Sequence, residues 1–129
     1  MAAVSLPVDA GSAGAARRLL RTALDGHQPA ATEDAVLMIS ELVTNAVRHT
    51  RALLLVLITV HGHMLRVDVS DDNPALPVAP SPEHYATNGR GLRIVDTLAD
   101  RWGITPTADG KTVWFEIDVG EPKTGARRP

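Results

Sequence analysis

Apolar residues recur at helical spacing in three parts of the chain. Residues 10–24, 32–49 and about 91–99 carry an apolar residue every three or four positions, which predicts three amphipathic helices. Thr32 is expected to cap the second helix through its side chain, and Gly26 to follow the first helix in a left-handed conformation.

Four further segments have the composition or the alternation of strands. Residues 52–60 form a run rich in leucine and β-branched residues, which predicts a strand buried on both faces. Residues 64–70 alternate apolar and polar after a turn that contains Gly62, so the two segments are expected to form a hairpin. Residues 102–105 and 111–119 form a second predicted hairpin.

Helices and strands are grouped along the chain rather than strictly alternating, which predicts an α+β fold. We expect a two-layer sandwich in which helices pack on one face of a mixed, mostly antiparallel sheet. The chain is expected to form a single domain over residues 1–129, with its core at about 10–119 and a flexible tail at 120–129. Prolines interrupt residues 71–88, so we expect a lid or binding loop at about 72–90.

Composition removes several classes of function. The chain has 129 residues, a net charge of -2, 3% aromatic residues and no cysteine. General nucleic-acid binding is therefore disfavoured, and thiolate nucleophiles, disulfides and cysteine-ligated metals are excluded. No apolar run is long enough for a membrane span and no signal peptide is visible, so we expect a cytoplasmic protein.

Glu41 and Asn45 form the first candidate site. A spacing of four residues places both side chains on one face of the second helix, one turn apart. A carboxylate beside an amide oxygen suits one Mg²⁺ with its waters. Spacing alone nevertheless favours the simpler interpretation, in which both side chains face solvent.

A second candidate site follows the strand at residues 64–70, where the sequence reads Asp71-Asp72-Asn73. A carboxylate at the end of a strand can accept a hydrogen bond from an exocyclic amine such as that of adenine. The alternative is an Asx-type turn that only closes the strand. Asp71 continues the inward alternation of the strand and is therefore the preferred candidate. Asp72 is the alternative candidate for the same contact.

A third candidate site opens the helix at residues 91–99, where the sequence reads Asn88-Gly89-Arg90-Gly91-Leu92. Glycines allow a close backbone approach, and a helix N-terminus offers N–H groups to an anion. An ordinary glycine-rich helix entry is an equally good interpretation.

The order of these motifs resembles the GHKL ATPase family, which has the Bergerat fold. Within it, the chain is most similar to the small anti-sigma-factor serine/threonine kinases of actinobacterial type. The phrases that carry the resemblance are Glu41-Leu-Val-Thr-Asn-Ala-Val-Arg-His49, Leu65-Arg-Val-Asp-Val-Ser-Asp71, Gly89-Arg-Gly-Leu-Arg-Ile-Val95, Leu98-Ala-Asp-Arg-Trp-Gly103 and Gly110-Lys-Thr-Val-Trp-Phe115.

The resemblance implies a role for each candidate residue. Asn45 would supply an amide oxygen to Mg²⁺, and Glu41 would orient or deprotonate the attacking hydroxyl. Asp71 would accept from the adenine amine, and Thr112 would support that contact directly or through water. The other residues expected to contact ATP are Asn73, Asn88, Gly89, Arg90, Gly91 and Leu92.

Two functions of different class follow from the resemblance. In the first, the protein is an ATP-dependent kinase that binds a sigma factor and phosphorylates an anti-sigma-factor antagonist, acting as a homodimer. In the second, it is a binding module that sequesters a regulatory partner without phosphoryl transfer. The family's Asp motif usually reads D-x-G-x-G, and the glycines are missing from Asp71-Asp-Asn-Pro-Ala75, where Asn73 can replace the first. This departure favours the second function, and intact Glu41 and Asn45 favour the first.

Overall fold

The computed structural model describes residues 2–7, 9, 11–49, 53–72 and 90–121. The expected contacts at Asn73, Asn88 and Gly89, most of the expected lid and the tail from residue 122 lie outside these residues. The elements in chain order are β1 (Ala2–Pro7), α1 (Ser12–Ala23), α2 (Pro29–His49), β2 (Leu53–His61), β3 (Met64–Asp71), α4 (Arg90–Leu98), β4 (Arg101–Pro106) and β5 (Lys111–Asp118).

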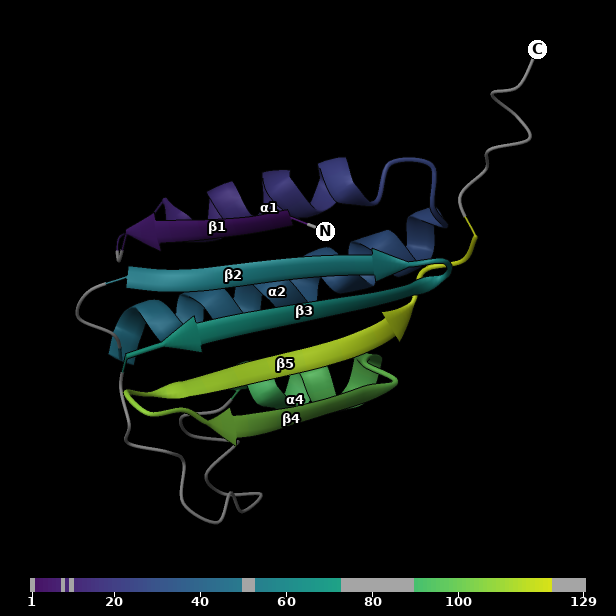
Figure 1. The fold of residues 1–129 in the computed structure, drawn as a ribbon. Coiled ribbons are helices and arrows are strands. Elements are labelled where there is room, and N and C mark those ends of the chain that lie inside the picture. The colour runs from purple at the N-terminus through teal and green to yellow at the C-terminus, as the bar shows by residue number, and fades with distance from the viewer. Residues whose placement is uncertain (1, 8, 10, 50–52, 73–89, 122–129) are drawn as a thin grey trace.

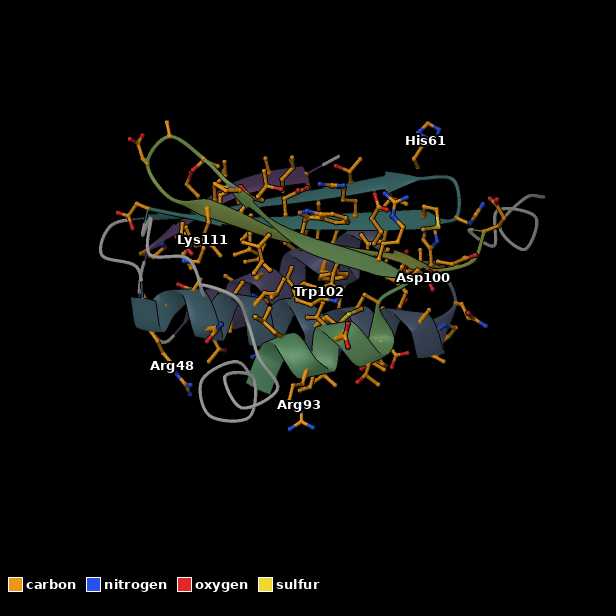
Figure 2. The ribbon with its side chains drawn as sticks, turned by 90° about the horizontal axis from the view of Figure 1, so that it is seen from below. Arg48, His61, Arg93, Asp100, Trp102 and Lys111 are labelled. Atoms are coloured by element: carbon orange, nitrogen blue, oxygen red, sulfur yellow. The ribbon has the colours of Figure 1, made fainter. Side chains whose placement is uncertain are left out.

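The strands form one five-stranded sheet in the order β1-β2-β3-β5-β4 (Figure 1). Every pairing among the described strands is antiparallel, so the parallel component of the expected mixed sheet is absent there. Helices α1, α2 and α4 lie together on one face of this sheet, which Figure 2 shows as two layers. The predicted α+β two-layer sandwich is confirmed.

Strand β1 is an element that the sequence pattern did not predict. It pairs with β2, which begins more than forty positions later in the chain. The pairing runs from Ala2 opposite Ile58 to Pro7 opposite Leu53. Leu6 is buried in the core, whereas Ala3 and Ser5 are exposed. A six-residue edge strand that ends in proline gives too short an alternation to be recognised without its partner.

The prediction that β2 is buried on both faces is wrong. Leu54, Val56 and Ile58 are fully buried, but Leu55 between them is 47% exposed. The reason is that the helices cover only one face of the sheet, so alternate side chains of β2 point to the open face.

Helix α2 begins three residues before the expected cap. Pro29 occupies the first helical position, where its missing N–H costs no helical hydrogen bond. The Thr32 hydroxyl donates to the Gln28 carbonyl at 2.9 Å, so Thr32 lies inside the helix and does not cap it. Gly26 has φ 88°, as expected for the glycine after α1.

A polar cluster covers part of the open face of the sheet. Arg66 bonds to Asp68 at 3.1 Å and to Glu116 at 3.2 Å, and its guanidinium lies 4.3 Å from the ring centroid of Trp114. The hydrogen bond from Arg66 to Asp68 raises the pKa of Arg66, although burial acts in the opposite direction.

Among the described helices, none combines the length and apolar character that a membrane crossing requires.

Candidate functional site

Asp71 ends β3 on the face that the helices cover. Leu65, Val67 and Val69 are buried on that face, and the Asp71 side chain continues the series with 3% exposure. Its oxygens lie 3.1 and 3.3 Å from the ammonium nitrogen of Lys111. Asp72 is exposed, so the structure agrees with Asp71 as the inward carboxylate of the two.

Lys111 is a residue of this site that the sequence interpretation missed. It lies directly across from Asp71 in the register of β3 and β5, and its side chain is 10% exposed. Figure 2 places it between the sheet and the helices, at the end where α2 finishes. A signal was present in the sequence, because Lys111 shares the inward alternation of Val113, Phe115 and Ile117.

Gly110 allows the two strand ends to approach this closely. A Cβ atom at this position would lie 1.9 Å from the carbonyl oxygen of Asp71 and 2.9 Å from the Cα of Asp72. Backbone atoms cannot move aside as a flexible side chain can, so only glycine fits at this position. The sequence pattern identified Gly110 as a turn residue, but its contact with Asp71 depends on the pairing of distant strands.

Thr112 does not join Asp71. It pairs with Ser70 in the register, and the two hydroxyl oxygens lie 2.7 Å apart. Because successive side chains of a strand point to opposite faces, Thr112 lies on the open face while Asp71 and Lys111 face the helices. The Thr112 side chain therefore makes no direct contact with the Asp71 carboxylate, which Lys111 contacts instead.

Glu41 and Asn45 lie in the second half of α2, and both are half-buried. They are therefore not core residues. They are also not fully exposed to solvent, although the simpler interpretation predicted that they would be. Helical spacing places them on one stripe with Leu37, one turn before Glu41. Leu37 lines a pocket with α4, so this stripe of α2 lies along the α4 side of the helical layer.

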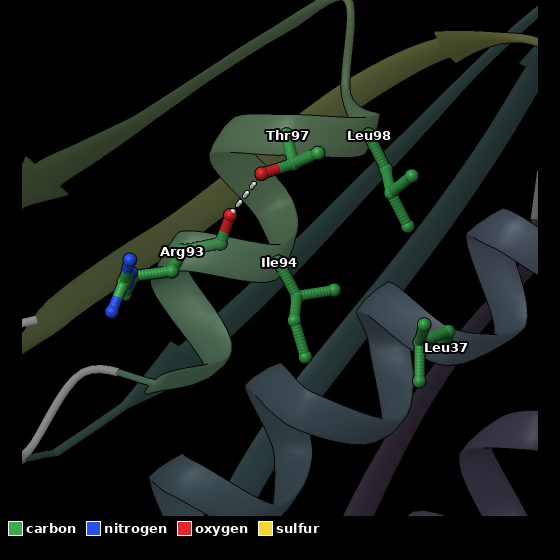
Figure 3. Close-up of a pocket in the computed structure, with 5 residues that line it drawn as sticks. All are labelled: Leu37, Arg93, Ile94, Thr97 and Leu98. Carbon is green, nitrogen blue, oxygen red and sulfur yellow. Dashed lines mark hydrogen bonds between the residues drawn. The ribbon is translucent and has the colours of Figure 1, made fainter. Parts of the chain in front are cut away.

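The pocket between α2 and α4 has a volume of about 360 Å³ (Figure 3). Its lining is formed by Leu37, Arg93, Ile94, Thr97 and Leu98, and the Thr97 hydroxyl donates to the Arg93 carbonyl at 2.9 Å. Among the described residues that line the pocket, none is an expected ATP contact.

Helix α4 begins at Arg90, slightly before the expected start at about residue 91, so Arg90, Gly91 and Leu92 form its first turn. The Leu92 side chain is buried in the core, which leaves only its backbone for a ligand. In Figure 1 the start of α4, the end of α2, the end of β3 and the start of β5 lie toward the same end of the molecule. The described candidate residues Asn45, Asp71, Lys111 and the first turn of α4 thus belong to one region.

The chain is similar to known proteins over most of its length. A family model described as the histidine kinase-like ATPase domain matches residues 6–117. An uncharacterised protein of Streptomyces coelicolor is 34% identical over 89 residues, which are 64% of this chain and 83% of that protein.

Two solved structures have the same fold. The RsbU and RsbW domains of Rv1364c from Mycobacterium tuberculosis match with TM-score 0.73 and 23% identity, over 94% of this chain and 32% of that one. The histidine kinase domain of a blue-light activated histidine kinase from Erythrobacter litoralis matches with TM-score 0.55 and 22% identity, over 88% of this chain and 61% of that one. The chain spans less than two thirds of either structure, and at these identities the likeness shows the fold alone.

Proposed function

Because the chain belongs to the histidine kinase-like ATPase family, we propose that it binds ATP at the end of the sheet where Asp71 and Lys111 meet. The observation that carries this proposal is the inward, buried carboxylate of Asp71, close to the ends of α2, β5 and α4. We propose further that the protein is a serine/threonine kinase of the anti-sigma type.

In this proposal, each described element contributes one part of the nucleotide site. Asp71 accepts a hydrogen bond from the adenine amine. The first turn of α4, from Arg90 to Leu92, offers backbone N–H groups and the positive end of the helix dipole to the phosphates.

Asn45 is the residue that would hold Mg²⁺. Among the described residues, no group of three His, Cys, Asp or Glu side chains could enclose a metal ion. Mg²⁺ suits such a site, because it is commonly bound by few protein ligands together with phosphates and waters. When bound, Mg²⁺ neutralises charge on the phosphates.

Glu41 is the proposed general base. It precedes Asn45 by one turn, so its carboxylate can reach a hydroxyl placed beside the terminal phosphate. The carboxylate takes the serine proton while the serine oxygen forms a bond to the γ-phosphorus. The bond from that phosphorus to the ADP oxygen breaks, and the products are phosphoserine and ADP.

The proposed partners follow from the resemblance to anti-sigma-factor kinases. We propose that the protein binds a sigma factor, phosphorylates an anti-sigma-factor antagonist and acts as a homodimer. The similarity in fold to the structure of the RsbU and RsbW domains of Rv1364c supports this proposal.

A second candidate function is a binding module that holds a regulatory partner without phosphoryl transfer. Two observations favour it. The glycines of the family's Asp motif are absent after Asp71, and the charge of Asp71 is already balanced by Lys111.

Replacement of Glu41 separates the two functions. Glu41→Ala is expected to retain ADP binding and to lower phosphorylation of an antagonist serine by about 10²–10⁴-fold, because the nucleophile loses its base. The measurement is transfer of labelled phosphate from ATP to candidate antagonist domains. Thr44→Ala is the matched control, because Thr44 is an exposed residue of the same helix.

Each outcome of this experiment has a distinct meaning. If Glu41→Ala transfers phosphate as fast as the wild-type protein, Glu41 is not the base. If the wild-type protein binds ADP and a sigma factor but transfers no phosphate, the binding module is the function.

A further inference from the structure

The ion pair between Asp71 and Lys111 is unusual for its burial. The side chains are 3% and 10% exposed, and the ammonium lies within 3.3 Å of both carboxylate oxygens. Removing two charges from water is costly, and a well-packed apolar pair is often at least as stable. Stability of the fold therefore does not explain why this position carries charges.

The pair is held in a fixed arrangement at the candidate nucleotide site. Asp71 and Lys111 are cross-strand neighbours, so both side chains leave the sheet on the side of the helices. The contact of Gly110 with the Asp71 backbone fixes the distance between the two strand ends. A carboxylate acceptor and an ammonium donor are thus presented next to each other.

Adenine has the complementary arrangement. Its exocyclic amine donates hydrogen bonds, and the ring nitrogens N1 and N7 beside the amine accept them. A carboxylate has about four lone-pair sites and an ammonium has three N–H donors, so each group can make several hydrogen bonds at once.

We propose that Lys111 is a base-reading residue, which donates a hydrogen bond to a ring nitrogen of adenine while Asp71 accepts from the neighbouring amine. This inference rests on the proposed function, because it assumes that ATP binds at Asp71. It adds a second contact to the base and assigns a ligand-binding role to a residue that the sequence interpretation left without one.

Nucleotide analogues test the contact directly. Calorimetry with Mg²⁺ compares ADP, 1-deaza-ADP and 7-deaza-ADP, in which one ring nitrogen is replaced by a C–H group. One of the two analogues is expected to bind the wild-type protein about ten- to a hundredfold more weakly than ADP, because a hydrogen bond from a charged donor is lost. The analogue that is weakened identifies the nitrogen that Lys111 contacts.

The same titrations on Lys111→Met complete the test. Methionine has a similar length and no hydrogen-bond donor, so the difference in affinity between ADP and the weakened analogue is expected to disappear. Thr105→Val is the matched control, because Thr105 is an exposed residue of the neighbouring strand β4, and there the difference in affinity is expected to remain. If Lys111→Met does not fold, Lys111→Gln replaces it, and the difference is then expected to shrink.

The inference is overturned if the wild-type protein binds the three nucleotides equally. It is also overturned if the weakened analogue is penalised as strongly in the Lys111 variant as in the wild-type protein. Failure of the wild-type protein to bind ADP at all would remove the proposed function together with this inference, and is therefore distinguishable from both results.

Discussion

Asp71 illustrates how a single position combines structure and chemistry. The alternation of β3 places it toward the helices, and the pairing with β5 brings Lys111 to its carboxylate. Asp72, the next residue, is exposed. Two adjacent carboxylates of the same chemistry thus have different surroundings, and substitution at each is expected to have a different effect.

Asp71→Asn is expected to weaken ADP binding about tenfold, because the amide still accepts from the adenine amine but the charge is lost. It is also expected to lower the free energy of unfolding by about 3–5 kcal/mol, since the buried Lys111 loses its counter-charge. Calorimetry and denaturant unfolding measure the two effects. Asp72→Asn is the control, and its effect on stability is expected to stay within about 0.5 kcal/mol. Equal or reversed effects on binding would assign the base contact to Asp72.

At the scale of elements, the connection between α1 and α2 is attached to the end of β5. The ring nitrogen Nδ1 of His27 donates to the Gly120 carbonyl at 2.7 Å, and the Gln28 N–H donates to the Val119 carbonyl at 2.9 Å. His27 is buried, so its ring fills space as well as making this bond. These contacts join the helical layer to the sheet at the end opposite the candidate site (Figure 1).

His27→Ala is expected to lower the free energy of unfolding by about 1–3 kcal/mol, because the Gly120 carbonyl loses its partner in a half-buried place. Hydrogen exchange at the amides of Val119 and Gly120 is expected to become faster, which mass spectrometry or NMR can measure. His61→Ala serves as the comparison, since His61 is exposed at the β2–β3 turn and its replacement is expected to be nearly neutral. Unchanged stability of the His27 variant would contradict this view of the connection.

At the scale of the whole molecule, the sheet and helices enclose one core, and none of the described helices covers the other face of the sheet. Phe115, Ile58 and Leu65 lie fully buried between the layers, whereas Leu55 lies on the open face. The candidate nucleotide site lies at the edge of this core. A ligand bound there is therefore expected to stabilise the whole fold rather than one loop.

Mg·ADP at about 100 times its Kd is expected to add about 2.7 kcal/mol to the stability of the folded state. For a domain of this size, each kcal/mol raises Tm by roughly 3–5 °C, so we expect a rise of about 8–13 °C. Differential scanning calorimetry measures it, with Mg·UDP as the control that has a pyrimidine in place of adenine. An unchanged Tm in millimolar Mg·ADP would argue against a nucleotide site in this protein.

The amino-acid sequence by itself determined the class of the fold and most of the elements. Helical spacing identified α1, α2 and α4, and alternation identified β3 and β5, because these signals arise within one segment and do not depend on a partner. The inward orientation of Asp71 was predicted for the same reason, since the side chains of a strand alternate with a period of two.

The tertiary structure decided what depends on contacts between distant segments. Strand β1 is stabilised by β2, the exposure of Leu55 follows from helices that cover only one face, and the meeting of Lys111, Gly110 and Asp71 follows from the register of β3 and β5. The alternation within each strand determines which face a side chain lies on, but it does not by itself determine which residue of a strand some forty positions away lies opposite, because a slip of two residues keeps every side chain on the same face.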